Sequence, residues 1–95
     1  MWQIGQYVRY NFDDRTLHYG FGSIHKVVRD LNFQTRLLGI HDFLKVNRSN
    51  DELLDYADIN TISDQELVEV MSFLRDGRFL INPQDFGEDH RYSRN

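Results

Sequence analysis

The four histidines are the side chains of this chain that could take the most chemical roles, because imidazole binds metals and transfers protons near neutral pH. His18, His25, His41 and His90 form no His-x-His pair and lack the i, i+4 spacing that places two ligands on one helix face. His41 precedes Asp42, but adjacent side chains of an extended strand point to opposite faces. We therefore expect surface or partly buried histidines and predict no metal site.

Ser23 and His25 would share one face of a strand, which is the nearest approach in the chain to a nucleophile beside a base. No pattern around them indicates an oxyanion site. Gly20-x-Gly22 is too short for a nucleotide-binding glycine fingerprint, and it precedes a strand-like run instead of a helix. We expect no catalytic residues and no cofactor.

Aromatic residues are abundant, with seven Phe, five Tyr and one Trp among 95 residues. Large rings fill a small core with few side chains, so some should remain for a binding face. Tyr7, Tyr19, Phe21 and Phe43 are candidates for an aromatic surface that holds a methylated Lys or Arg, stacks bases or anchors a partner peptide. In the alternative interpretation, two or three of these rings belong to the core.

Charge is distributed unevenly along the chain. Residues 1–50 carry seven Lys/Arg and four Asp/Glu, whereas residues 51–76 carry eight acids and only one Arg. Arg9, Lys26 and Arg36 are possible phosphate contacts, although such residues also keep strands soluble. The net charge of −4 argues against a purely nucleic-acid-binding domain. This separation of a basic from an acidic segment favours a protein partner or self-association. In the alternative interpretation, the acidic residues only form the solvated face of a helix.

The chain has no cysteine, which excludes disulfides and thiolate chemistry. Its first residues lack a signal-peptide pattern, and no apolar run approaches the length of a membrane span. We expect a soluble, cytoplasmic protein with no membrane partner, and we consider a bacterial or phage origin.

Alternating apolar and polar residues predict a strand over residues 2–12, a turn at 13–15 and a long strand over 17–30 bent at Gly20 and Gly22. Residues 33–40 and 42–48 predict a third and a fourth strand. Residues 52–56 favour a fifth strand, although Ser49-x-x-Glu52 also matches a helix capping box. A 3₁₀ turn at 57–59 and a closing strand at 60–62 would follow.

A helix is predicted after Ser63, because Ser63 and Glu66 have the spacing of a capping box. Leu67, Val70, Met71 and Leu74 recur at helical spacing on one face, and Asp76-Gly77 ends the pattern. At the edge of that face, Phe73, Glu66 and Glu69 are candidate partner contacts. In the alternative interpretation, Phe73 packs on the segment 79–81 and belongs to the core.

These elements predict a mostly β fold of the α+β class, in which an SH3-like small barrel of about five strands precedes one C-terminal helix. The barrel would span residues 1–62 and the helix 63–77. A short strand or ordered loop would follow over 78–86 and a flexible tail over 87–95, all within one domain.

The segments Gly5-x-x-Val8, Tyr19-Gly20-Phe21-Gly22-Ser23-Ile24 and Tyr56-Ala57-Asp58-Ile59-x-x-Ile62 together resemble a Tudor-like, SH3-type small barrel. The pattern is similar to the C-terminal barrel of bacterial DNA-repair helicases and to barrels of some bacterial transcription factors. The resemblance covers residues 4–62 and implies binding to RNA polymerase or another protein, sometimes with nucleic acid nearby.

The predicted function is therefore that of a non-enzymatic adaptor or regulator that binds a larger protein. The alternatives are a nucleic-acid-binding module that uses the basic strands and a structural subunit that self-assembles through its charge polarity. The sequence leaves the oligomeric state open.

Overall fold

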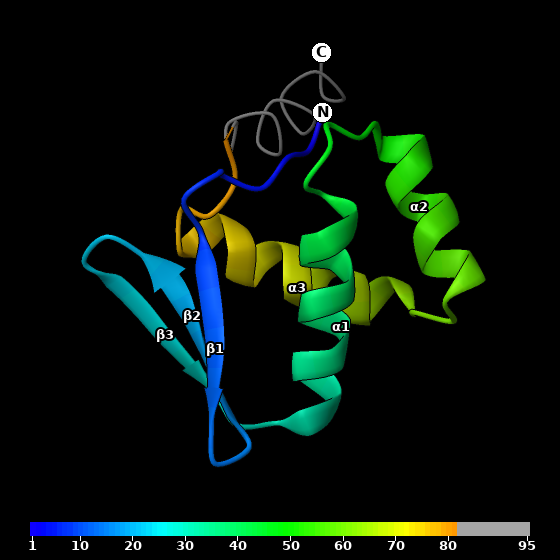
Figure 1. Ribbon diagram of the computed structural model, residues 1–95. Coiled ribbons are helices and arrows are strands. Elements are labelled where there is room, and N and C mark those ends of the chain that lie inside the picture. Colours follow the sequence, from blue (N-terminus) through cyan, green and yellow to red (C-terminus); the bar gives the residue numbers. More distant parts are fainter. Residues whose placement is uncertain (82–95) are drawn as a thin grey trace.

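A computed structural model describes residues 1–81, which fold into a three-stranded antiparallel sheet and three helices (Figure 1). The strands are β1 (Arg9–Asp13), β2 (Thr16–Phe21) and β3 (Ile24–Val28), in the spatial order β1-β2-β3. The helices are α1 (Leu31–Phe43), α2 (Asn50–Ile59) and α3 (Asp64–Asp76). The sheet forms one side of the molecule and α2 the other, with α1 and α3 between them.

Two tight turns connect the three strands. Asp14 and Arg15, with φ of 52° and 68°, join β1 to β2, as the predicted turn at 13–15 requires. Gly22 and Ser23 join β2 to β3, with φ of 54° at Gly22. Positive φ in two-residue loops matches the right-handed twist of the flanking strands. The single long strand predicted over 17–30 is thus two strands, because Gly22 opens a hairpin.

The prediction of a closed barrel of about five strands followed by one helix is wrong. The sheet is open and has three strands within the described residues, and two further helices precede α3. The segments 33–40, 42–48, 52–56 and 60–62 contribute no strand to this sheet, because they lie in α1, in α2 and in the connections around α2. The barrel fold that the resemblance implied for residues 4–62 is therefore also wrong.

Helix α1 forms where a third strand was predicted, because its first turn is capped and its apolar spacing is helical. The carboxylate of Asp30 accepts a hydrogen bond from the Phe33 backbone N–H at 2.9 Å. Leu37, Ile40 and Leu44 are fully buried and follow at intervals of three and four residues. The run therefore satisfies the helical period over more residues than the strand period.

Two complete capping boxes begin α2 and α3. The hydroxyls of Ser49 and Ser63 accept from the backbone N–H of Glu52 and Glu66, each at 3.1 Å. The two glutamates return the bond to the serine N–H groups, and these bonds lower the pKa of both carboxyls. The predicted α3 and its buried face are confirmed. For α2, the capping signal was correct and the favoured strand was wrong.

The central strand β2 contributes two residues to the hydrophobic core, which it shares with the helices, the N-terminal segment and residues 79–80. Leu17 and Tyr19 are fully buried on the sheet face that packs against the helices, and the ring of Phe79 meets that of Tyr19 edge-on at 4.9 Å. In the register, Tyr10 and Phe12 of β1 pair with these two residues and so share their face. The helices bury the central strand but leave β1 exposed along its length.

The N-terminal segment before β1 is held between two other parts of the chain. Trp2 exchanges backbone hydrogen bonds with Arg48, and the Ile4 N–H donates to the Leu44 carbonyl at 2.9 Å. On the other side, the Gly5 N–H donates to the carbonyl of Phe79 at 2.9 Å. The strand predicted over 2–12 therefore begins only at β1, and residues 1–8 form a fixed wall beside the end of α1.

The chain after α3 returns to this segment. Leu80 forms a single bridge with Ile4, and the Ile81 N–H donates to the Gln3 carbonyl at 2.9 Å, so part of the element predicted over 78–86 is extended backbone. The predicted tail 87–95, with His90, lies outside the described residues. Within residues 1–81, no helix combines the length and apolar character needed to cross a membrane.

Candidate functional site

The structure does not bring the four predicted aromatic contacts onto one surface. Tyr19 lies in the core, and Phe21 is partly buried at its edge. Phe43 stacks on the ring of Tyr56 from α2, with centroids 4.4 Å apart. Among the four, Tyr7 alone is largely exposed, at 68%. This packing matches the alternative interpretation, in which two or three of the rings belong to the core.

Phe73 lies in an aromatic cluster between α3 and the sheet. Its ring centroid is 5.4 Å from that of Phe33 and 5.8 Å from those of Tyr19 and Phe79. Its packing on Phe79 matches the alternative interpretation of the sequence. Phe73 therefore packs at the edge of the core. Truncation of its side chain would lower the stability of the fold more than it would affect the binding of a partner.

The predicted charged contacts are also separated. Arg36 pairs with Glu66 between α1 and α3 at 3.1 Å. Arg9 lies on the outer face of the sheet, whereas Lys26 pairs with Tyr19 in the register and projects from the helix-facing side. Glu69 is exposed on α3. The three predicted phosphate contacts therefore do not form one cationic surface.

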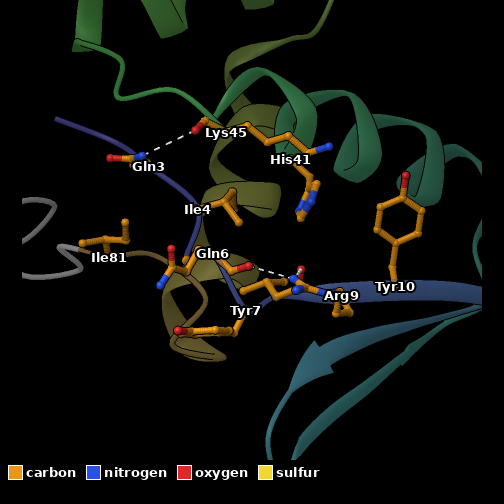
Figure 2. Close-up of a pocket in the computed structure, with 11 residues that line it drawn as sticks. Gln3, Ile4, Gln6, Tyr7, Arg9, Tyr10, His41, Lys45 and Ile81 are labelled. Atoms are coloured by element: carbon orange, nitrogen blue, oxygen red, sulfur yellow. Dashed lines mark hydrogen bonds between the residues drawn. The ribbon is translucent and has the colours of Figure 1, made fainter.

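A groove of about 760 Å³ lies between the N-terminal segment and the end of α1 (Figure 2). Residues 3–10 form one wall, His41 and Lys45 form the other, and Ile81 completes the lining. Figure 2 shows the His41 ring projecting from α1 toward the segment that carries Arg9. The volume is within the range of pockets that bind ligands.

The groove is cationic and rich in hydrogen-bond donors. A guanidinium nitrogen of Arg9 donates to the carbonyls of Gln6 at 2.7 Å and Val8 at 3.2 Å, which holds the side chain along the wall. Lys45 lies opposite, with its ammonium 3.4 Å from the Asp42 carboxylate outside the lining. Because no carboxylate from residues 1–81 lines the groove, the field of these residues suits an acidic group.

A buried hydrogen bond supports the α1 wall. The hydroxyl of Tyr19 lies 2.6 Å from Nδ1 of His41. Burial lowers the pKa of His41, with a further contribution from nearby Lys45, and burial raises the pKa of Tyr19. At neutral pH the tyrosine is therefore the donor and His41 is neutral with its proton on Nε2. With Nδ1 engaged in this bond, His41 offers the groove one N–H donor.

Tyr10 and Phe12 of β1 form what we call the aromatic ledge. Their ring centroids are 6.5 Å apart and nearly perpendicular, and the side chains are 45% and 53% exposed. The ring of Tyr10 also meets His41 edge-on at 5.4 Å, so the ledge continues into the groove. Sequence analysis missed the ledge, because strand alternation assigned both rings to the apolar face and carried no signal for exposure.

Comparison with protein-family models, curated proteins and solved structures finds no match to this chain.

Proposed function

We propose that this protein is a non-enzymatic adaptor that binds a partner protein by accepting an extended segment of it along β1 and the adjoining groove. One observation carries the proposal: β1 is an edge strand with all five residues exposed, including two aromatic residues on its helix-facing side. An edge strand presents unpaired N–H and C=O groups that can pair with another strand. Strand addition is a recurring mode of peptide recognition.

The chemistry of the surface defines the partner segment. The aromatic ledge offers an apolar platform, and exposed Tyr rings are common anchors of protein interfaces. Arg9 and Lys45 make the groove cationic. We therefore propose a segment with apolar side chains over the ledge and an acidic side chain that reaches the groove.

The alternatives have less support from the arrangement of side chains. A nucleic-acid module would need its cations on one face, yet Arg36 is paired with Glu66, and Arg9 and Lys26 lie on opposite faces of the sheet. Self-assembly would use the same free edge, with β1 of a second copy as the added strand. The oligomeric state of the protein distinguishes self-assembly from the binding of a different partner.

Selection from a library of displayed extended peptides tests the proposal. The enriched peptide is titrated into the 15N-labelled protein, and we expect the largest amide shifts in β1 and at His41. Phe12→Thr removes half of the ledge while keeping a residue suited to a strand, and it should weaken binding at least tenfold. Val27→Thr is the matched control, because Val27 is a comparably exposed residue of the other edge strand, β3.

Other outcomes overturn the proposal. A library that yields no enriched peptide contradicts it, as does a peptide whose shifts map to α2 and α3. If sedimentation shows a dimer that Phe12→Thr converts to a monomer, the occupant of β1 is a second copy, and self-assembly replaces the adaptor function.

A further inference from the structure

His18 of β2 and His25 of β3 form a pair on the sheet face turned away from the helices. The register places Val27 opposite His18 and Gly20 opposite His25, so the two histidines are diagonal neighbours across the hairpin. Because Gly20 has no side chain, space is left for the His25 ring to reach His18. Nδ1 of His18 lies 2.9 Å from Nε2 of His25.

The geometry of this pair is close to that of two ligands on one metal ion. The ring planes differ by 16° and the ring centroids are 5.1 Å apart, so the rings meet edge to edge instead of face to face. Two imidazoles that each place a nitrogen about 2.0–2.1 Å from one tetrahedral zinc ion hold those nitrogens about 3.3 Å apart and their ring centroids about 5 Å apart. Rotation of the rings about their side-chain bonds therefore directs both lone pairs at one ion, with the hairpin backbone unchanged.

Metal binding changes the tautomer of the pair without releasing a proton. The hydrogen bond between the rings needs an N–H on one of the two facing nitrogens. A metal needs a lone pair on both, so this proton moves through solvent to the other nitrogen of the same ring. Both imidazoles then bind as neutral ligands, and the ion replaces the shared proton as the link between β2 and β3.

The surroundings of the pair suit a cation. Both rings line an open hollow of about 430 Å³ with Asn11, Phe12 and Asp13 of β1. Asp13 contributes a carboxylate and Asn11 an amide oxygen, and no Lys or Arg of residues 1–81 lines this hollow. Arg9 belongs to the same sheet face, but its guanidinium donates to backbone carbonyls of residues 6 and 8 and lies outside the lining.

We propose that His18 and His25 form a binding site for a divalent transition-metal ion that joins β2 to β3. Imidazole suits Zn²⁺, Ni²⁺ and Cu²⁺, whereas Mg²⁺ and Ca²⁺ prefer oxygen ligands. Within residues 1–81, no third His, Asp or Glu completes a metal-binding group. The protein therefore supplies two nitrogens, and water completes the coordination of an ion that exchanges with solvent.

The spacing of the two histidines explains why the sequence predicted no metal site. They are seven residues apart, which matches neither His-x-His nor the i, i+4 spacing of a helix. Only the two-residue turn at Gly22 and Ser23 brings these positions together. The ligands lie on the sheet face opposite to the rings of the aromatic ledge, and the metal site does not depend on the proposed adaptor function.

Titration of the 15N-labelled protein with zinc chloride at pH 7.5 tests the site. Spectra of the imidazole nitrogens should show saturable shifts of Nδ1 of His18 and Nε2 of His25, with one zinc ion bound per chain. Because the unfolded chain does not hold the two rings together, excess zinc should also raise the melting temperature by several degrees. Cu²⁺ should compete with zinc for the pair, whereas Mg²⁺ at the same concentration should leave both nitrogens unshifted.

Variants identify the ligands. His18→Asn and His25→Asn should each weaken zinc binding at least about tenfold, because the second imidazole of the parent binds the ion intramolecularly. His90→Asn is the matched control: it makes the same substitution outside the described residues and should bind zinc as the parent does. Melting curves without metal verify that each variant is folded before affinities are compared.

Four results would overturn the proposal. The first is the absence of saturable shifts at both histidines below millimolar zinc, and the second is parental affinity in His18→Asn or His25→Asn. The third is an equal loss of affinity in His90→Asn, which would place the ligands elsewhere. The fourth is a ratio of one zinc ion to two chains, because the ion would then bridge two copies instead of two strands of one hairpin.

Discussion

The Tyr19 hydroxyl and His41 Nδ1, 2.6 Å apart, join the central strand of the sheet to α1 inside the core. Both groups are buried and uncharged at neutral pH, and the exposed ring of Tyr10 packs edge-on against the same histidine. The pair therefore couples the core to the aromatic ledge, and changes in it should reach the proposed binding surface.

Tyr19→Phe should destabilise the protein by about 1–3 kcal/mol, because it leaves the buried Nδ1 of His41 without a donor. Urea unfolding measures this change in the free energy of unfolding. Tyr7→Phe is the control, since Tyr7 is exposed, and it should unfold as the parent does. Equal stability of Tyr19→Phe and the parent would show that the buried hydrogen bond contributes nothing.

Acidification should destabilise the protein through His41. Its pKa is below the ordinary value of 6.5 in the folded state, so the unfolded chain binds more protons in this range. The corresponding stability is present above pH 6.5 and is lost as pH falls toward the folded-state pKa. Glu52 and Glu66, whose pKa values are below 4.5, change the stability of the protein only at a lower pH than His41 does.

The measurement is the free energy of unfolding at pH 7.5 and 5.5 for the parent and for His41→Asn. At pH 7.5 the variant should have a lower free energy of unfolding than the parent. This free energy should fall less between pH 7.5 and 5.5 in the variant, because the Asn side chain does not titrate. An identical loss in both proteins would assign the pH dependence to other groups.

The helices show which parts of the fold were predictable from local signals. Ser63 and Glu66 lie three residues apart, and their reciprocal hydrogen bonds form within one helical turn, so α3 was predictable. Ser49 and Glu52 carry the same signal for α2, but strand-like neighbours led to the wrong choice. For α1, the apolar residues within 33–40 also fit a strand, and the helix is indicated by the cap at Asp30 and by the helical spacing that continues to Leu44.

The candidate site was less predictable, because exposure depends on distant parts of the chain. Tyr10 and Phe12 alternate in the sequence as Leu17 and Tyr19 do, and the register places all four on one face. The helices cover the central strand and Val28 of β3 but not β1, so one pair is buried and the other is exposed. Local periodicity contains no information about which strand lies at the edge.

The two glycines of the β2–β3 hairpin and Gly5 of the N-terminal segment should differ in their tolerance to substitution. Gly20→Ala should cost the most, because its Cβ would meet the Ile24 carbonyl at 2.0 Å. Gly22→Ala has open space but requires a positive φ, so we expect a cost of about 1 kcal/mol. Gly5→Ala meets only ordinary contacts and should be nearly neutral. Urea unfolding ranks the three, and a neutral Gly20→Ala would refute the close approach of the hairpin backbone.

The two capping serines, Ser49 and Ser63, should contribute equally to the stability of the protein. Ser49→Ala and Ser63→Ala should each cost about 1 kcal/mol, because each removes the acceptor for a backbone N–H at a helix start. Ser72→Ala, within α3, is the control and should change stability little. Thermal unfolding of the three variants makes the comparison. A loss restricted to Ser63→Ala would mean that α2 forms independently of its cap.

Hydrogen exchange of the β1 amides, with and without the selected peptide, tests the proposed adaptor function most directly. Alternate N–H groups of β1 point away from β2 and have no partner strand within residues 1–81. Strand addition pairs these groups, so their exchange should slow at least tenfold in the complex while that of the β3 amides stays unchanged. Peptide binding that leaves β1 exchange unaltered, or that protects α2 or α3 instead, would contradict strand addition at the aromatic ledge.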